Sequence, residues 1–519
     1  MCARAVVGSA HGMRRSLRAD TRGSHSVEHL VLVGLVALGA AAGVRYFGNR
    51  IDDKVIEQAS CIANLAACAG GSEARTTAPG SEAAALTHGD ATGPASPGET
   101  VLVRQVRRAN SAPTQEPAVA TKMNENIDGA IALRRRGHDI PEHLLPTDHP
   151  WVGGNATEYL IDGPQVFPRI LGDLEKANDS IHISHFAIGN DKLGAEVGKI
   201  LTDKARAGVE VRVLLDPAGS DDLLKIGKTE RMLKEWEAAG VQVIRNYHIN
   251  PLRRAEMLNH IEHRKMFIID GKVAYTGGMG IQEKYRSEWH DVMIRAQGEA
   301  TRQMQVDYLK TWQHLGGRID QKGGTDADLK KRFFPEAGRP GDVSLRGLSQ
   351  IPGEAPVIRE TYLREINAAK KSFWIENPYF TDARVLDALE AAARRGVDVR
   401  VVLPGKTDMP LTQWAARGEY DRLMKAGIKI YEYDGMTHAK VAVRDGEWAT
   451  VGSSNLDSLS LNHLYEWNYE TSDPKLSDEV RTMIERDTRR SKEITPKDTK
   501  GVNNYIYKLL DLPFVSYWL

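Results

Sequence analysis

Short runs rich in valine and isoleucine alternate with amphipathic segments over much of the chain. SIHISHFAI (180–188) and GVEVRVLLD (208–216) have the length of strands, and LGAEVGKILTDKARA between them has apolar residues at helical spacing. RVLDALEAAARR has the same helical spacing further along. Strands and helices in alternation predict an α/β fold in which helices cover buried sheets.

The strand-like runs occur twice, in the same order. SIHISHFAI corresponds to SFWIENPYF (372–380), GVEVRVLLD to GVDVRVVLP (396–404), and GVQVIRNY (240–247) to GIKIYEYD (427–434). Such self-similarity indicates a duplicated structural unit. We therefore predict two pseudo-symmetric α/β sandwich lobes, residues 151–340 and 341–519, that meet at one central cleft.

The N-terminal part has a different pattern. LVLVGLVALGAAAGV (30–44) carries no charge, and five arginines precede it. The run is shorter than the ~20 residues of a standard membrane span, and the arginines favour an N-terminus in the cytoplasm. Three interpretations fit: a single-span anchor in a bacterial inner membrane, a cleaved secretory signal, and a type IV pilin-like leader, which GSHSVEHLVLVGLVALGAAAG resembles. All three place the rest outside the cytoplasm, tethered or periplasmic; a buried cytosolic helix is the remaining alternative.

Two segments therefore precede the lobes. Residues 1–68 form a basic segment with an apolar membrane or leader helix, and residues 69–150 form a low-complexity linker with a lead-in helix. Cys61 and Cys68 lie just beyond the apolar run. They either pair in an oxidising compartment or lie as small apolar residues on one helix face.

Charge and cysteine content narrow the functional classes. Lys+Arg number 69 and Asp+Glu number 69, so the formal net charge is zero. Proteins that bind duplex DNA usually have a basic excess, which argues against nucleic acid as the main partner. The repeated lobes contain no cysteine, which excludes thiol chemistry and cysteine-based zinc sites there.

The motif H-x-K-x4-D occurs once in each lobe. Its residues are His263, Lys265 and Asp270 in the first copy and His438, Lys440 and Asp445 in the second. Histidine and lysine two positions apart on a strand point to the same face, so each copy presents an imidazole beside an ammonium. Each aspartate precedes a glycine and therefore either joins the reacting group or shapes an Asp-Gly turn.

Two facing imidazoles suit in-line displacement at phosphorus. One attacks as a nucleophile and the other protonates the leaving oxygen, while lysines, with Ser453 and Asn455 of the turn GSSN, hold or orient the phosphoryl oxygens. Asp291 lies 28 residues after His263, and Glu466 lies 28 residues after His438. A carboxylate at this offset can bind the far ring nitrogen of a histidine and fix its tautomer. The scheme needs no metal and no cofactor, and chelators should have little effect.

These residues resemble the phospholipase D superfamily, whose signature is two HKD motifs. The second lobe is similar to bacterial cardiolipin synthases in ENPYFTDARVLDALEAAARRGVDVRVVLPGKTDMPL, AGIKIYEYDGMTHAKV and GSSNLD, and the first lobe in LIDGPQVFPRIL, HRKMFIIDGKVAYTGG and EWHDVMIR. The resemblance covers residues 155–519. It implies a phosphohistidine intermediate with His263 as nucleophile and His438 as acid/base. Gly280 stands where the family's first turn usually ends in asparagine.

The leading hypothesis is a membrane-tethered enzyme that transfers phosphatidyl groups between phospholipids such as phosphatidylglycerol, as cardiolipin synthases do. The same chemistry with water as acceptor makes a phospholipase D that releases phosphatidic acid, and on nucleic acid it makes a metal-independent nuclease. A non-enzymatic surface module of pilin type is the last alternative. The sequence leaves the oligomeric state open.

Overall fold

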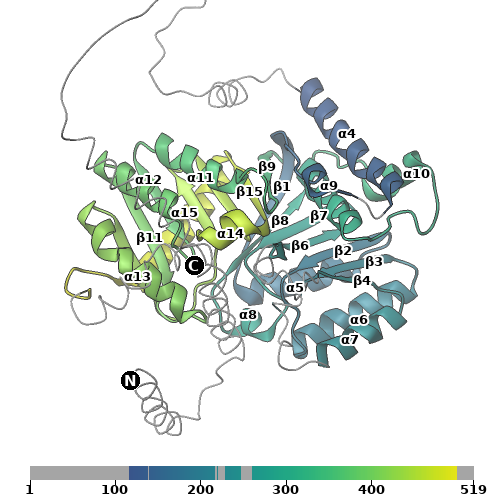
Figure 1. Ribbon diagram of the computed structural model, residues 1–519, viewed down its shortest axis with the longest axis horizontal. Helices are drawn as coiled ribbons and strands as arrows, with labels where there is room; N and C mark the ends of the chain where they lie inside the picture. The colour runs from purple at the N-terminus through teal and green to yellow at the C-terminus, as the bar shows by residue number, and fades with distance from the viewer. Residues whose placement is uncertain (1–115, 138–139, 217–218, 220–227, 247–259, 500–519) are drawn as a thin grey trace, which may run out of the picture. The chain divides into compact units, whose positions relative to one another are not determined.

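The computed structural model describes residues 116–137, 140–216, 219, 228–246 and 260–499. The apolar run 30–44, Cys61, Cys68 and most of the predicted linker lie outside the described residues. Among the described residues, no helix combines the length and apolarity that crossing a membrane requires. These residues form a mixed α/β fold, which confirms the predicted class (Figure 1).

The strands fall into two series. The first half contains β1 (Val152–Ile161), β2 (Ser180–His185), β3 (Glu210–Leu215), β4 (Gln242–Arg245), β5 (Ile261–Glu262), β6 (Lys265–Ile269), β7 (Val273–Gly277) and β8 (Val292–Gln297). The second half contains β9 (Val343–Gln350), β10 (Ser372–Glu376), β11 (Asp398–Pro404), β12 (Lys429–Tyr433), β13 (Val441–Arg444), β14 (Trp448–Gly452), β15 (Leu464–Thr471) and β16 (Lys492–Glu493).

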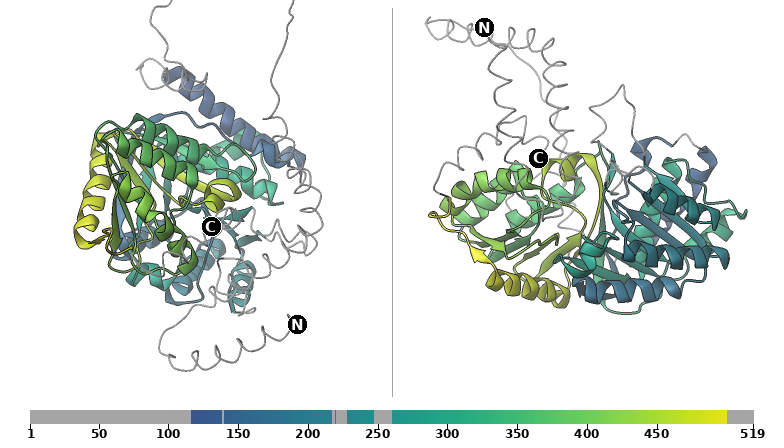
Figure 2. Two further views of the ribbon diagram at one scale, coloured as in Figure 1. Left: turned by 60° about the vertical axis from the view of Figure 1, so that its left-hand side comes forward. Right: turned by 90° about the horizontal axis from the view of Figure 1, so that it is seen from below.

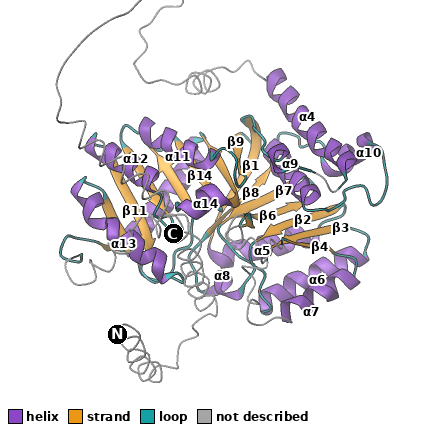
Figure 3. Ribbon diagram, in the orientation of Figure 1, coloured by secondary structure: helices purple, strands orange, loops and turns teal. Residues whose placement is uncertain are grey.

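The two series join in one continuous sheet. Its order is β16-β12-β11-β10-β13-β14-β15-β9-β1-β8-β7-β6-β2-β3-β4, with β5 paired to β15. Each half contributes three parallel strands and an antiparallel set in the same order, and the halves meet where β1 pairs antiparallel with β9. The band of strands in Figure 3 runs through both halves without a break. The duplication predicted from the repeat is therefore present, but the halves share one sheet.

Helices cover both faces of this sheet (Figure 2). The first half contains α4 (Glu116–Ala132), α5 (Asp162–Glu175), α6 (Lys192–Arg206), α7 (Lys228–Ala238), α8 (Glu283–Ser287), α9 (Glu299–His314) and α10 (Asp326–Phe333), and the 3₁₀ turns η1 (Leu133–Arg136) and η2 (Glu142–Leu144). The second half contains α11 (Val357–Ala368), α12 (Ala383–Arg394), α13 (Pro410–Lys425), α14 (Ser458–His463) and α15 (Pro474–Arg490).

Alternation along the strands divides the apolar residues into layers. On β6, Met266 and Ile268 join a core that also contains residues of α4, α9 and α15 and spans both halves. Phe267 and Ile269 point to the opposite face, into a core built with α5, α6 and α7. A third core lies against α11, α12 and α13 of the second half. The first core and a smaller fourth cluster, which includes Leu145 and Tyr465, contain residues of both halves and so join them.

The repeated glycines mark equivalent turns from helix to strand. Gly208 and Gly396 have φ of 93° and 92°, and Gly240 and Gly427 both have φ of 100°. These angles favour glycine because a Cβ is strained there. The glycines recur in the sequence because both halves end these helices with the same positive-φ turn. The domain boundaries themselves stay a prediction, and α4 lies within the segment predicted as a linker with a lead-in helix.

Candidate active site

The two motif histidines lie just before equivalent strands, β6 and β13. The backbone N–H of His263 donates to the carbonyl of Tyr465 (3.1 Å), and the backbone N–H of His438 donates to the carbonyl of His290 (2.7 Å). Tyr465 directly precedes Glu466, and His290 directly precedes Asp291. Each histidine is therefore fixed to the opposite half, beside the carboxylate that the sequence singles out.

The side chains repeat this crossed arrangement. His263 Nδ1 lies 2.6 Å from Glu466 Oε1, and His438 Nδ1 lies 2.8 Å from Asp291 Oδ2. Both carboxylates are fully buried, and both imidazoles are largely so. The sequence placed a carboxylate at the same offset in each copy, and the structure brings each one to the histidine of the other half.

The carboxylate contact selects one tautomer of His263 and favours the same one for His438, where Lys440 Nζ also lies 3.0 Å from Nδ1. A carboxylate accepts a hydrogen bond from Nδ1–H, so the nitrogen with a free lone pair is Nε2. The carboxylate also stabilises the imidazolium that forms when Nε2 gains a bond or a proton. The arrangement can therefore supply a nucleophile in one half and an acid/base in the other.

The side chain of each motif lysine folds back to the backbone of the histidine of its own motif. Lys265 Nζ donates to the carbonyl of His263 (2.6 Å), and Lys440 Nζ donates to the carbonyl of His438 (2.7 Å). Burial lowers the pKa of Lys265 to about 7 and that of Lys440 to about 8, against the opposing pull of Glu466 and Asp291. Both ammoniums are therefore poorly solvated, which strengthens their attraction for an anionic phosphate.

Electrostatic coupling shows that the two halves build one site. Burial lowers the pKa of His438 well below its ordinary value, and the charges of Lys440, Lys265 and His263 lower it further. Burial likewise lowers the pKa of His263 to about 4, despite the raising effect of Glu466. Residues far apart in the chain thus act on each other's ionisation across the junction of the halves.

The two carboxylates differ in their support. Burial opposes ionisation of Glu466, but His263 and Lys265 outweigh it and hold its pKa below the ordinary value. Glu466 also accepts hydrogen bonds from the hydroxyls of Ser453 and Ser460. Burial raises the pKa of Asp291 to about 7, and its Oδ1 accepts from the backbone N–H of Val292. Glu466 is therefore the better prepared of the two carboxylates to remain ionised and to stabilise a positive charge on its histidine, His263.

The turn residues take separate positions. Ser453 binds Glu466, so it orients the carboxylate. Asn455 is buried, and within the described part of the chain its Oδ1 has no hydrogen-bond partner. In the first half, a Cβ on Gly278 would lie 2.3 Å from Asp291 Oδ1, and a Cβ on Gly280 would lie 2.5 Å from the ring of Tyr285. Tyr285 thus fills the space that an asparagine side chain would need at position 280.

The motif aspartates do not reach the imidazoles. Asp270 and Asp445 occupy the hairpin turns at the far ends of β6 and β13, with φ of 53° and 55°. Asp270 accepts backbone N–H groups from residues 178–180, and Asp445 accepts those of residues 370–372. The sequence grouped both with the catalytic residues, but these contacts correspond to its alternative, in which they shape the Asp-Gly turns.

Replacing Asp445 with alanine is therefore expected to lower the free energy of unfolding by about 2–3 kcal/mol, because three backbone amides lose a charged acceptor. Any turnover by the folded protein should stay nearly unchanged. Urea unfolding and initial rates, measured on the same preparation, check this. A collapse of turnover with unchanged stability would return Asp445 to the reacting group.

Aromatic side chains that the sequence did not single out surround the imidazoles. Phe186 meets the His263 ring edge-on, with centroids 5.1 Å apart. Tyr285 and Trp289 each lie 5.4 Å from the His438 ring, and Tyr379 lies 6.4 Å from it. Trp289 and Tyr379 lie within the stretches EWHDV and ENPYF, which carry the family resemblance. Their place in these stretches is the sequence feature that could have identified them. These rings give both imidazoles apolar, aromatic neighbours.

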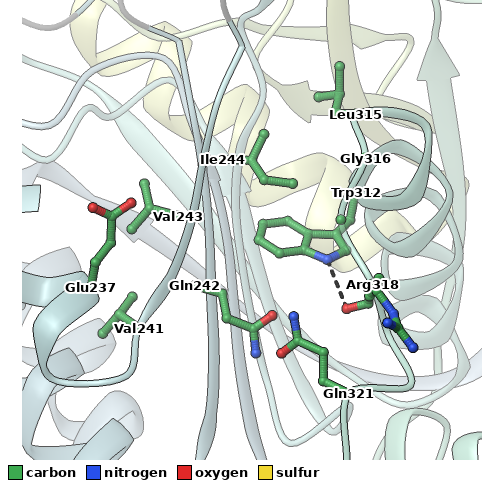
Figure 4. Close-up of a pocket in the computed structure, with 11 residues that line it drawn as sticks. Glu237, Val241, Gln242, Val243, Ile244, Trp312, Leu315, Gly316, Arg318 and Gln321 are labelled. Carbon is green, nitrogen blue, oxygen red and sulfur yellow. Dashed lines mark hydrogen bonds between the residues drawn. The ribbon is translucent and has the colours of Figure 1, made fainter. Parts of the chain in front are cut away.

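One cavity lies elsewhere, at the edge of the sheet. It has a volume of about 450 Å³ and is lined by β4 and by the end of α9, including Ile244, Trp312 and Arg318 (Figure 4). The indole N–H of Trp312 donates to the carbonyl of Arg318 (3.3 Å). None of the candidate residues lines this cavity.

Comparisons with known proteins show which family the chain resembles. Residues 170–312 and 362–488 match the protein family described as "Cardiolipin synthase, PLD-like domain". A cardiolipin synthase of Geobacillus kaustophilus is 34% identical over 331 residues, which are 62% of this chain and 63% of that relative. One of Geobacillus thermodenitrificans is 34% identical over 379 residues, 70% of this chain and 73% of that relative.

Solved structures add a likeness in fold. The crystal structure of phosphatidylserine synthase from Haemophilus influenzae aligns with a TM-score of 0.52 at 14% identity, over 68% of this chain and 92% of that one. At this identity the likeness concerns the fold alone.

Proposed function

The chain belongs to the PLD-like cardiolipin synthase family, and from this premise we propose that it transfers phosphatidyl groups between phospholipids through a phosphohistidine intermediate. The observation that carries the proposal is the crossed pairing of His263 with Glu466 and of His438 with Asp291. This pairing prepares two imidazoles, one from each half, for opposite roles at one phosphorus atom.

In the first step, Nε2 of His263 attacks the phosphodiester phosphorus. The P–O bond to the leaving alcohol breaks. For this step His438 carries protons on both ring nitrogens, paired with Asp291, and its Nε2–H gives a proton to the departing oxygen. In the second step, the neutral Nε2 of His438 takes a proton from the acceptor hydroxyl, whose oxygen attacks the phosphohistidine. The P–N bond then breaks, and both imidazoles return to their starting states.

The remaining polar groups stabilise charge on the phosphoryl oxygens. Lys265 and Lys440 supply cations in a water-poor environment, where electrostatic stabilisation of a transition state is strong. Asn455, whose Oδ1 is buried without a partner among the described residues, has amide hydrogens to offer a phosphoryl oxygen. Ser453 acts one step further out, because it holds Glu466.

The acceptor decides between transferase and hydrolase. With phosphatidylglycerol as the only lipid, we expect cardiolipin and glycerol in equal amounts, resolved by thin-layer chromatography and mass spectrometry. The aromatic surroundings of His438 support this outcome, since they limit access of water. Phosphatidic acid as the only lipid product would identify a phospholipase D, and the absence of both products would contradict the proposal.

The lysines predict the alkaline limit of activity. Since the folded pKa of Lys265 is lowered to about 7 and that of Lys440 to about 8, the cationic forms are present below these values and are lost above them. We expect kcat/KM to fall by about 10-fold or more between pH 6 and pH 9. A Lys265→Arg variant keeps its charge over this range and should show a flatter profile at a lower rate. A wild-type profile that rises through pH 9 would contradict the role of the lysines.

We also propose that the enzyme works at a membrane surface, because its substrates are phospholipids and because residues 30–44 form an uncharged apolar run. That run lies outside the described residues.

A further inference from the structure

Three buried side chains that take no part in the proposed reaction converge beside the active site. His290 lies two residues before β8, Glu376 ends β10, and Asp487 lies near the end of α15. Their ligand atoms all lie within 4.8 Å of one another. His290 Nε2 is 3.2 Å from Asp487 Oδ2 and 3.5 Å from Glu376 Oε1, and the side chains of Glu376 and Asp487 are fully buried.

The imidazole of His290 is oriented for a ligand on Nε2. Its Nδ1 lies 2.7 Å from Asp162 Oδ1, so Nδ1–H is donated to that carboxylate. Nε2 is buried and makes no hydrogen bond of acceptable geometry with the described residues, despite its closeness to two carboxylates. Oε2 of Glu376 is likewise buried without a partner there. An unsatisfied ring nitrogen thus lies next to two buried carboxylates, and one oxygen of Glu376 also lacks a partner among the described residues.

The separations match those of metal ligands. Nitrogen and oxygen ligands lie about 2.1 Å from zinc, so two ligands of a tetrahedral site lie about 3.4 Å apart. The observed 3.2 Å and 3.5 Å bracket this value. The contact of Asp162 with Nδ1 is the carboxylate–histidine contact that commonly supports a metal-bound imidazole.

The surrounding charges favour a cation. Asp162, Glu376 and Asp487 face His290, and the nearby positive group is Arg486, which binds Asp487. The hydroxyl of Thr437 donates to Glu376, and the ring of Tyr433 stacks on His290.

We propose that His290, Glu376 and Asp487 bind one divalent transition-metal ion, for which zinc fits the ligand types best, and that Asp162 orients His290 for it. One imidazole and two carboxylates suit zinc, and a water molecule would close the fourth position.

The ion has a structural role that is separate from the reaction at phosphorus. His290 belongs to the first half, and Glu376 and Asp487 belong to the second, so the ion joins the halves. The ligand His290 lies close to the reacting groups. It directly precedes Asp291, and the backbone carbonyl of His290 accepts a hydrogen bond from the backbone N–H of His438. The reacting imidazoles are not ligands, so removal of the ion weakens the fold before it alters the chemistry.

The test measures metal directly on the full-length chain, with its three cysteines replaced by serine so that thiolates do not compete. Elemental analysis of protein purified without chelator should give one zinc per chain. After chelator treatment, zinc chloride alone should bind with one-to-one stoichiometry by calorimetry and raise the thermal unfolding midpoint. Protein that contains sub-stoichiometric metal and does not respond to added zinc or manganese would overturn the proposal, leaving an ion pair of protonated His290.

Variants assign the site. His290→Gln and Glu376→Gln should abolish stoichiometric binding, and Asp162→Asn should weaken it by about 10–100-fold. Asp162 has φ of 62°, which asparagine tolerates, so this variant should fold even if the others do not. His260→Gln, which removes a partly exposed contact with Glu142, is the matched control and should bind zinc as the parent does. The assignment would be overturned if Asp162→Asn and either His290→Gln or Glu376→Gln, measured as separate variants, bound zinc as tightly as the parent.

Discussion

Replacing His263 with asparagine is expected to lower the rate of phosphatidyl transfer by about 10⁴-fold or more, a loss typical of removing a catalytic nucleophile. Asparagine keeps an N–H that can donate to Glu466, so the buried carboxylate is not left unpaired and the fold should survive. The measurement is the initial rate of cardiolipin formation, together with trapping of ³²P from labelled lipid on the chain by denaturation at alkaline pH, where a P–N bond survives. The trapped label should disappear in this variant.

His438→Asn should lower the rate as well, but for a different reason. A general acid contributes about 10²–10⁴-fold, and it is not needed when the leaving group is already a stable anion. A phosphatidyl ester of p-nitrophenol should therefore restore the first step in His438→Asn and leave His263→Asn inactive. His260→Gln serves as control and should behave as wild type. Substantial turnover of the natural lipid in His263→Asn would refute the two-histidine mechanism.

The crossed carboxylates give the second large effect. Glu466→Gln and Asp291→Asn should each lower turnover by about 10³–10⁴-fold, because an amide in place of the carboxylate no longer fixes the productive tautomer or stabilises the imidazolium. The two variants should fail at different steps. Glu466 lies in the second half but binds His263, so Glu466→Gln should prevent phosphohistidine formation even with the p-nitrophenyl ester.

Asp291→Asn should resemble His438→Asn, with its first step restored by the activated ester. Asp270→Asn makes the same carboxylate-to-amide change in the first half, at a turn where asparagine tolerates the positive φ, and should leave turnover nearly unchanged. If Asp291→Asn blocked adduct formation and Glu466→Gln did not, each carboxylate would serve the histidine of its own half, contrary to the observed contacts.

The sequence predicted much of the fold because its strongest patterns are local. Strand-length Val/Ile runs and amphipathic helices report which faces are buried, and the glycines at 208, 240, 396 and 427 end helices in the same backbone conformation twice. These features fixed the α/β class and the duplication. They did not reveal that β1 and β9 join the halves into one sheet, since antiparallel pairing of two strand edges leaves no periodic mark.

The candidate site divides in the same way. The H-x-K spacing placed each histidine and lysine on one face, and the shared offset of Asp291 and Glu466 marked both as partners of imidazoles. The offset is identical within each half, however, so it fits pairing within a half as well as pairing between halves. The motif aspartates were grouped with the histidines because they are close in sequence, whereas β6 and β13 carry them to the far ends of the strands.

The sequence by itself therefore determined the duplicated α/β scaffold, the two imidazole–ammonium pairs and the carboxylates that accompany them. Only the tertiary structure decided which carboxylate serves which histidine, that Tyr285 fills the space beside Gly280, and that His290, Glu376 and Asp487 meet. The physical reason is that periodicity and spacing record which face a residue occupies on its own element. Contacts between elements depend on how strands far apart in the chain lie side by side in the sheet, and no local pattern encodes that.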